Sequence, residues 1–241
     1  MRGTFLSDPS GLENRHVVVT GGAGALGFAV VQHLCELGAV CHVPLRGAEP
    51  PEHLHKLDPE RVRVAAVDVG RETDLEAFYS DLPGLWASVH CIGAFAAGGI
   101  ADAGLESARR LFEANLFSAL ACTRAAVLRM RRDGRGGRIV QVTARAGLEP
   151  RTAAGMATYA ASKAALVALT EALGEELAGE GILVSAVAPS VMDTPANRAA
   201  QPAADHAKWP TTGEVAQAIA WLASPANALV RSAIVPVYGK S

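Results

Sequence analysis

The stretch formed by residues 16–37 constrains the fold of this chain more than any other. It opens with Val17-Val18-Val19, a β-branched run typical of a central parallel strand that is buried on both faces. A glycine-rich turn follows at residues 21–27, and apolar residues then recur at helical spacing up to Leu37. A strand, a glycine turn and a helix N-terminus bring bare backbone N–H groups and the positive end of a helix dipole together. The stretch therefore predicts a βα unit that binds the diphosphate of a dinucleotide.

The turn has the pattern Gly-x-x-Gly-x-x-Gly. A Cβ at its glycines would block either the turn itself or the approach of a pyrophosphate. An ordinary tight βα loop is the alternative, which the strand before the turn and the helix after it make less favourable. The residues expected to contact the cofactor here are Gly21, Gly24, Ala25, Leu26 and Gly27.

Composition fits a single α/β domain spanning residues 1–241. Half of the residues are apolar and 19% are charged, which favours a sizeable core over disorder. The net charge of −2 gives no footprint for nucleic acid or an anionic membrane. Residues 1–14 lack the apolar segment of a signal peptide, and no run of ~18 uninterrupted apolar residues occurs. We expect a cytoplasmic protein that binds neither nucleic acid nor membrane.

Neither the cysteines nor the histidines show the spacing of a metal site. The four cysteines stand apart in apolar surroundings, as buried free thiols do in a reducing compartment. The histidines have no acids or thiols at metal-ligand spacing. We therefore expect no metal.

Apolar strand runs alternate with helical patterns along the chain, which is typical of βαβ units on a parallel sheet. The predicted strands lie near residues 15–20, 39–44, 61–67, 85–92, 137–143, 181–188 and 232–237. The predicted helices lie near residues 25–37, 72–81, 105–131, 156–178 and 213–223. Residues 193–210, with three prolines, predict an irregular insertion that serves as a substrate lid.

The second predicted strand ends in Leu45-Arg46-Gly47, without the carboxylate that usually holds the ribose 2′-hydroxyl of NAD. Arg46 either pairs with the 2′-phosphate of NADP(H), whose oxygens match its guanidinium, or is a solvated surface residue. After the third strand, Asp68 and Val69 are expected beside the adenine; Asp68 alternatively caps the helix near Glu72. On this pattern NADP(H) is favoured over NAD(H).

Tyr159-Ala160-Ala161-Ser162-Lys163 opens the apolar helix expected at 156–178. The i, i+4 spacing puts a phenol and an ammonium on one helix face, one turn apart. With the glycine turn, this motif makes the chain resemble the short-chain dehydrogenase/reductase family in its single-domain form. The resemblance implies a Rossmann-type, doubly wound parallel sheet of seven strands in the order 3-2-1-4-5-6-7, with helices on both faces. It also implies NAD(P)(H)-dependent reduction of a C=O or C=N group of a small molecule.

The resemblance implies a role for each matching residue. Tyr159 would be the proton donor, and Lys163 would lower its pKa and bind the nicotinamide ribose. Asn115 would hold a water in the proton relay, unless it is an ordinary helix residue bonded to the backbone. The further contacts implied at the nicotinamide end are Gly93, Pro189, Val191 and Thr194.

The fourth catalytic residue of the family, a serine after the fifth strand, falls on Ala144 here. Removing one such hydrogen-bond donor typically costs ~10²–10³ in turnover. Thr143 replaces it only if the strand end twists or bulges, because neighbouring strand residues point to opposite faces. Thr152 and Thr158 are other possible donors, or the substrate needs none.

Three departures from the family pattern are similar to dihydropteridine reductases, which keep the tyrosine and lysine. They are the Gly-Ala-Leu-Gly turn at 24–27, the segment His90-Cys91-Ile92-Gly93 and Ala144. Leu45, however, replaces the acid with which that subgroup binds NADH. Ala144 and the altered segment after the fourth strand favour the alternative of a redox-inactive relative: a non-redox cyclase or dehydratase, or a dinucleotide-sensing regulator. The intact set of Tyr159, Lys163 and Asn115 favours the reductase.

The alanine-rich helices near 105–131 and 156–178 allow close helix approach, and the resemblance implies that such helices pair across a two-fold axis. We therefore expect a homodimer or homotetramer. The residues expected to shape the substrate pocket are Phe95, Arg145, Arg151 and Met156. The two arginines either recognise an anionic group or are ordinary loop residues.

Overall fold

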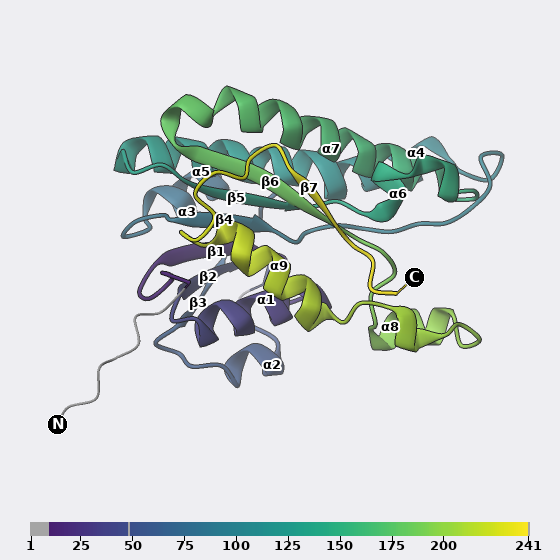
Figure 1. The fold of residues 1–241 in the computed structure, drawn as a ribbon, viewed down its shortest axis with the longest axis horizontal. Coiled ribbons are helices and arrows are strands. Elements are labelled where there is room, and N and C mark those ends of the chain that lie inside the picture. Colours follow the sequence, from purple (N-terminus) through teal and green to yellow (C-terminus); the bar gives the residue numbers. More distant parts are fainter. Residues whose placement is uncertain (1–9, 48, 241) are drawn as a thin grey trace.

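Seven parallel strands form one sheet in the order β3-β2-β1-β4-β5-β6-β7, which confirms the predicted topology (Figure 1). The structure is a computed structural model that describes residues 10–47 and 49–240, so the predicted domain ends at residues 1 and 241 lie outside the described part. The strands are β1 (His16–Thr20), β2 (Val40–Leu45), β3 (Val62–Ala66), β4 (Ala87–His90), β5 (Gly137–Val142), β6 (Ile182–Pro189) and β7 (Ile234–Val237). Strand order reverses between β1 and β4, where a crevice opens at the carboxyl ends of the strands.

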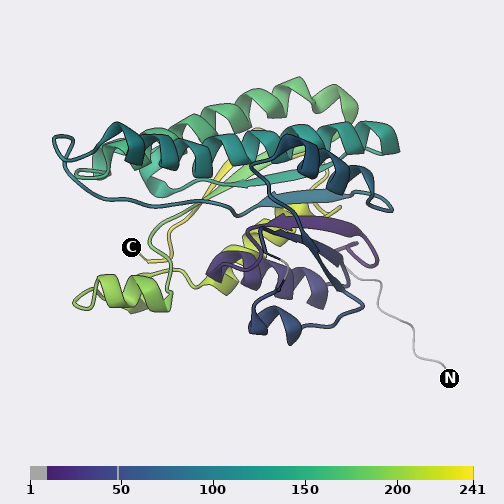
Figure 2. The same cartoon turned by 180° about the vertical axis from the view of Figure 1, so that it is seen from behind.

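Helices cover both faces of the sheet (Figure 2). Helices α3 (Glu72–Ser80), α5 (Ser118–Asp133) and α7 (Ala157–Glu176) lie on one face, and α1 (Ala25–Glu36) and α9 (Thr212–Ala223) on the other. The remaining helices are α2 (Glu52–His55), α4 (Leu105–Phe112), α6 (Arg145–Leu148) and α8 (Pro195–Ala200), and short 3₁₀ turns lie at Pro150–Thr152, Ala178–Glu180 and His206–Lys208. Helix α8 stands beyond the carboxyl edge of the sheet, near the C-terminus (Figure 1).

Strand β1 shows why the sequence pattern was informative. Val17 and Val19 pack in the core beneath α1 and α9, whereas Val18 packs in the core beneath α3 and α5. Successive side chains of a strand point to opposite faces, so only a strand covered on both sides accepts three consecutive valines.

The predicted helix at 105–131 is interrupted. Between α4 and α5 lies a π-helical segment, η1 (Glu113–Phe117), which carries the buried side chain of Asn115. Within the described ranges this stretch, Leu105–Asp133, is the one helix long and apolar enough to cross a membrane by length and composition. It packs against α3, α7, β4 and β5 in the fold.

The segment 193–210 is more regular than predicted, because it contains α8 and a 3₁₀ turn. The Thr194 hydroxyl caps α8 by accepting a 3.2 Å hydrogen bond from the Asn197 N–H, and Pro195 occupies the first helical turn. Both residues are typical of a helix start.

A chain of buried polar side chains crosses the core below the crevice. The Tyr79 hydroxyl lies 2.8 Å from the Ser88 hydroxyl, which lies 2.8 Å from Nε2 of His90. On the other side, Nδ1 of His90 lies 3.0 Å from Oε1 of Gln141, whose amide donates to the Thr123 hydroxyl at 2.8 Å. If His90 Nδ1 carries the proton, every polar atom in this chain finds a partner, and α3, β4, β5 and α5 are tied together.

Acid is expected to destabilise this core. Burial lowers the pKa of His90 to about 4, and burial, His16 and Arg63 lower that of His42 to about 4. Histidine in an unfolded chain titrates near ~6.5, so between these values the unfolded state binds more protons and stability falls as the pH falls. Urea unfolding should show a loss of at most about 1.4 kcal/mol per pH unit for each histidine in this window.

The variant His90→Gln should lose part of the pH dependence of the free energy of unfolding. His55→Gln, at an exposed histidine, is the matched control and should keep the wild-type slope. A slope that is the same in all three proteins would show that His90 is not responsible.

Candidate active site

The glycine turn joins β1 to α1 at the carboxyl edge of the sheet. Gly21 has a φ of 72°, and a Cβ there would lie 2.8 Å from the main chain of Cys91 and Ile92. A Cβ on Gly27 would overlap the main chain of Gly21, so both positions require glycine for close packing. Gly24 is the N-cap of α1, and within the described chain no side chain caps that helix. The first N–H groups of α1 are therefore available to a diphosphate.

Two other predicted contacts lie in the first turn of α1. Ala25 is exposed at its first position, whereas the Leu26 side chain is buried in the core. Leu26 can therefore reach a cofactor only through its main chain.

A cavity of about 720 Å³ runs along the carboxyl ends of β1 to β4, with α4, η1 and α5 as its other wall. Its size is within the range of ~300–1,000 Å³ for small-molecule and cofactor sites. Three of the residues predicted to bind the cofactor line it: Gly21, Arg46 and Val69. Together with the glycine cradle, the cavity fits a dinucleotide.

The residues that form the far wall of this cavity were not predicted from the sequence. It consists of Ile92 and of residues on the α4–α5 stretch: Arg110, Glu113, Ala114, Phe117, Ser118 and Ala121. Positions 110, 114, 117 and 121 share one helix face, so helical spacing around Asn115 was the signal that would have found them.

Arg46 and Asp68 meet across the ends of β2 and β3. Nε of Arg46 lies 3.3 Å from Oδ1 of Asp68, and the same oxygen accepts a 3.0 Å bond from the Gly70 N–H. The Gly70 N–H and then the Arg46 charge lower the pKa of Asp68. Arg71, not Asp68, is the N-cap of α3, so the capping alternative for Asp68 is wrong.

Tyr159 and Lys163 lie one turn apart on α7. Lys163 is buried, and its Nζ donates a 2.8 Å hydrogen bond to the Val142 carbonyl at the end of β5. Burial lowers the pKa of Lys163 to about 8 and raises that of Tyr159 to about 12. The Tyr159 phenol is thus protonated at neutral pH, while most of the Lys163 side chain is still charged.

Asn115 is joined to this pair through Ser162. The Asn115 amide donates to the Ser162 hydroxyl at 2.9 Å, and that hydroxyl donates to the Tyr159 carbonyl at 2.7 Å. The same amide exchanges two hydrogen bonds with the main chain of Ala94. A Cβ on Gly93 would lie 3.0 Å from Asn115 Oδ1 and 3.3 Å from Lys163 Nζ. The structure therefore brings these predicted residues together, with Ser162 as an additional link.

Thr143 is not brought into this group. Its hydroxyl is buried and donates to the Lys163 carbonyl at 2.8 Å, so the strand end does not twist it toward a substrate. Ala144 follows as the N-cap of α6 and is 9% exposed. Of the other hydroxyl candidates, Thr152 bonds to the Glu149 carbonyl, while Thr158 is half-buried beside Tyr159. Thr143 serves to anchor α7 on β5 in this structure.

The segment after β6 carries the last predicted cofactor contacts. Pro189 ends β6, Val191 is 38% exposed, and Thr194 is buried as the cap of α8. The Thr194 hydroxyl accepts in that cap, so its hydrogen can still be donated to a ligand.

Cys91 adds a neutral thiol beside Lys163. Burial raises its pKa to about 12, and the Lys163 charge acts in the opposite direction. All four cysteines are free. In the part of the chain that the structure describes, no three His, Cys, Asp or Glu side chains are grouped to hold a metal.

A sheet that reverses its strand order beside a glycine turn, with tyrosine, lysine and asparagine at its carboxyl edge, defines a nicotinamide-dinucleotide oxidoreductase. The family model for short chain dehydrogenase matches residues 15–205, and the chain belongs to this family.

Known proteins support this assignment. Galactitol 2-dehydrogenase of Rhizobium johnstonii is 33% identical over 255 residues, covering 94% of both chains. NADPH-dependent aldehyde reductase 2, chloroplastic, of Arabidopsis thaliana is 29% identical and covers 78% of this chain and 76% of that protein. The solved acetoin dehydrogenase from Enterobacter cloacae has a TM-score of 0.83 at 25% identity, covering 94% of both chains.

The protein is therefore an NAD(P)-dependent oxidoreductase acting on a small molecule. The comparisons do not favour the redox-inactive alternative. They do not show the similarity to dihydropteridine reductases, which stays a prediction.

Proposed function

We propose that this protein is an NADP(H)-dependent reductase of a C=O or C=N group, with Tyr159 as the proton donor. The proposal rests on one observation: hydrogen bonds hold Tyr159, Lys163 and Asn115 in one group beside a cavity that fits a dinucleotide. When bound, the nicotinamide supplies the hydride. The protonated phenol of Tyr159 supplies the proton to the substrate heteroatom.

Lys163 has two functions in this proposal. One of its three N–H donors is bonded to the Val142 carbonyl, which fixes the ammonium in place. The remaining donors are available to the nicotinamide ribose and to a water held at Asn115. The ammonium charge lowers the cost of forming the Tyr159 phenolate when the proton leaves.

The test is to incubate the purified protein with NADPH and a panel of aldehydes, ketones and imines while following NADPH absorbance. We expect turnover of at least one carbonyl or imine substrate. Calorimetry that detected binding of neither NADPH nor NADH would refute the proposal.

The cofactor preference is proposed to rest on Arg46. Asp68 accepts a hydrogen bond only from Nε of Arg46, so the two terminal guanidinium nitrogens are available to a 2′-phosphate. Arg46→Ala should raise the Kd for NADPH by about 10–100-fold, the value of one or two charge-assisted hydrogen bonds, and change the Kd for NADH by less than about threefold. Arg71→Ala, at a nearby arginine paired with Asp74, is the control. Equal effects of Arg46→Ala on both cofactors would contradict the assignment.

We further propose a cytoplasmic homodimer or homotetramer that uses the 193–210 segment as a lid. The support for assembly is an apolar face on α5, where Leu120 and Leu128 are 43 and 46% exposed. Light scattering should give two or four times the chain mass of 24.9 kDa. A mass equal to one chain would rule out the assembly.

A further inference from the structure

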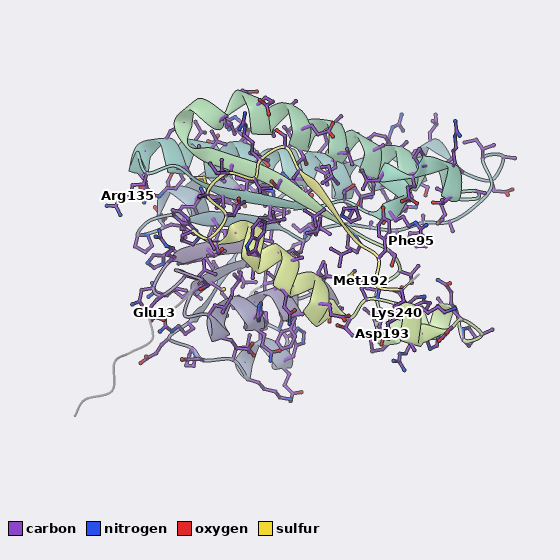
Figure 3. All side chains as sticks on the ribbon, viewed as in Figure 1. Glu13, Phe95, Arg135, Met192, Asp193 and Lys240 are labelled. Carbon is purple, nitrogen blue, oxygen red and sulfur yellow. The ribbon has the colours of Figure 1, made fainter. Side chains whose placement is uncertain are left out.

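The loop between β4 and α4 is unusually apolar for an exposed segment. Residues 94–104 contain one charged side chain, Asp102. Phe95, Ile100 and Leu105, at the first position of α4, are 63, 76 and 75% exposed. The loop extends past the carboxyl edge of the sheet, and Figure 3 shows Phe95 at the same end of the molecule as Met192, which precedes α8. Exposed apolar clusters of this kind mark binding surfaces.

Phe95 connects this loop to the catalytic tyrosine. Its ring meets the Tyr159 ring edge to face, with centroids 5.0 Å apart and an interplanar angle of 78°. The rest of the Phe95 ring remains exposed, so a ligand that approaches Tyr159 would cover an aromatic surface.

A second, smaller cavity adjoins this contact through the chain neighbours of Phe95 and Tyr159, although neither ring lines it. It has a volume of about 130 Å³ and is bordered by Ala96, next to Phe95 in the chain, and by Thr158, next to Tyr159. The rest of its wall is mostly small or apolar: Ala97, Gly98, Ala103, Ala108, Leu111 and Met156, with Asp102 and Ser107. A cavity of ~150 Å³ can hold a benzene molecule, so this one has room for a group of about ring size.

This inference rests on the proposed reductase: we infer that the reducible group of the substrate carries an uncharged, apolar substituent of ring size, which packs on the exposed ring of Phe95 and extends into the cavity beside it. In the reaction the carbonyl carbon gains the hydride of NADPH and its oxygen gains the Tyr159 proton. The products are the alcohol and NADP⁺, and Tyr159 regains a proton from solvent. The reducible carbon lies at Tyr159 while the substituent lies between Phe95 and α4.

Most polar groups around Tyr159 are already paired, which disfavours a polyhydroxylated or anionic substrate, while Ser107 and Thr158 remain as hydroxyls in the cavity wall. The Thr143 hydroxyl is bonded to Lys163, and Arg145 is paired with Glu149 at 2.7 Å. Ala144 offers no donor, and Asp102 repels an anion at the cavity. Each hydroxyl buried without a partner costs about 1–3 kcal/mol, so a sugar chain would lose affinity here.

The test compares aldehydes with the same reactive group, using the enzyme with bound cofactor. We expect kcat/KM for benzaldehyde and cyclohexanecarbaldehyde to exceed that for glyceraldehyde by about 30-fold or more. Ala108→Leu, which fills the cavity from α4, should reduce this ratio by about tenfold. Ala228→Leu, at an exposed alanine outside the site, is the matched control and should keep the wild-type ratio. Ala97→Leu, on the exposed loop, replaces Ala108→Leu if the latter fails to fold.

The outcomes separate this inference from the proposed function. Equal or better reduction of glyceraldehyde, an unchanged ratio in the cavity variant, or reduction of neither aldehyde by cofactor-bound enzyme would overturn the inference. Absence of NADPH and NADH binding would instead overturn the proposed function.

Discussion

Replacing Tyr159 by Phe should lower kcat for reduction by about 10²–10⁴-fold, the usual contribution of a positioned general acid. The change removes one hydroxyl and keeps the ring that packs against Phe95. The Ser162 bond to the main-chain carbonyl of residue 159 is also unaffected. The Kd for NADPH, measured by fluorescence titration, should therefore stay within about threefold of wild type.

The chain offers a control for this variant. The Tyr238 ring follows β7 and packs against Arg145. Tyr238→Phe removes only the hydroxyl and should leave kcat within about threefold of wild type. Retention of full turnover by Tyr159→Phe would remove the tyrosine from the mechanism. Loss of NADPH affinity in the same variant would show that the hydroxyl acts in binding instead.

The second large effect is expected from Lys163→Met. This change removes a buried ammonium beside Gly93, and with it the charge that we propose stabilises a Tyr159 phenolate. We expect kcat to fall by about 10²–10³-fold, and the Kd for NADPH to rise by about tenfold or more through loss of a charge-assisted hydrogen bond. Lys56→Met, at an exposed lysine on the surface, should change neither.

The pH dependence of NADPH binding checks the same residue. Since burial places the pKa of Lys163 at about 8, its charged fraction in the free enzyme falls as the pH rises through 8. NADPH affinity of the wild type should therefore be flat below that value and fall above it. The decline should disappear in Lys163→Met and move to higher pH in Lys163→Arg, because guanidinium keeps its charge. An identical decline in all three would exclude Lys163.

Element positions were largely predictable because the sheet is buried on both faces. Strands covered by helices need continuous apolar runs, such as Val17-Val18-Val19, and these runs stand out from the helical spacing between them. The short helices α2, α6 and α8 were not predicted, since four to six residues give no periodicity. The Thr194-Pro195 start of α8 was present in the sequence as a capping signal.

The site was predictable where a motif sets the geometry and unpredictable where packing sets it. Tyr159 and Lys163 share a face of one helix, and helix geometry alone places them together. Whether Thr143 could replace the serine missing at Ala144 depended on the direction of one hydroxyl at a strand end. The fold decides that direction, since the hydroxyl bonds to the Lys163 carbonyl.

The π-helical segment at Asn115 is also set by packing and could not be predicted from a motif. A continuous 3.6-residue pattern predicts an unbroken helix from 105 to 131, and the sequence carries no glycine or proline between those positions to break it. The interruption appears where the Asn115 amide bonds to Ala94 on one side and Ser162 on the other. Those partners are distant in sequence, so only the assembled fold brings them to the helix.

By itself the sequence indicated the buried strands, the glycine turn and the pairing of phenol with ammonium, because each depends on contacts within one strand, turn or helix. The order of the strands followed from the family resemblance. The tertiary structure decided which hydroxyls remain available, how Asn115 joins the tyrosine, and which cavity adjoins the Phe95 loop. Each of those depends on side chains from separate elements, and their directions follow from packing that local spacing does not specify.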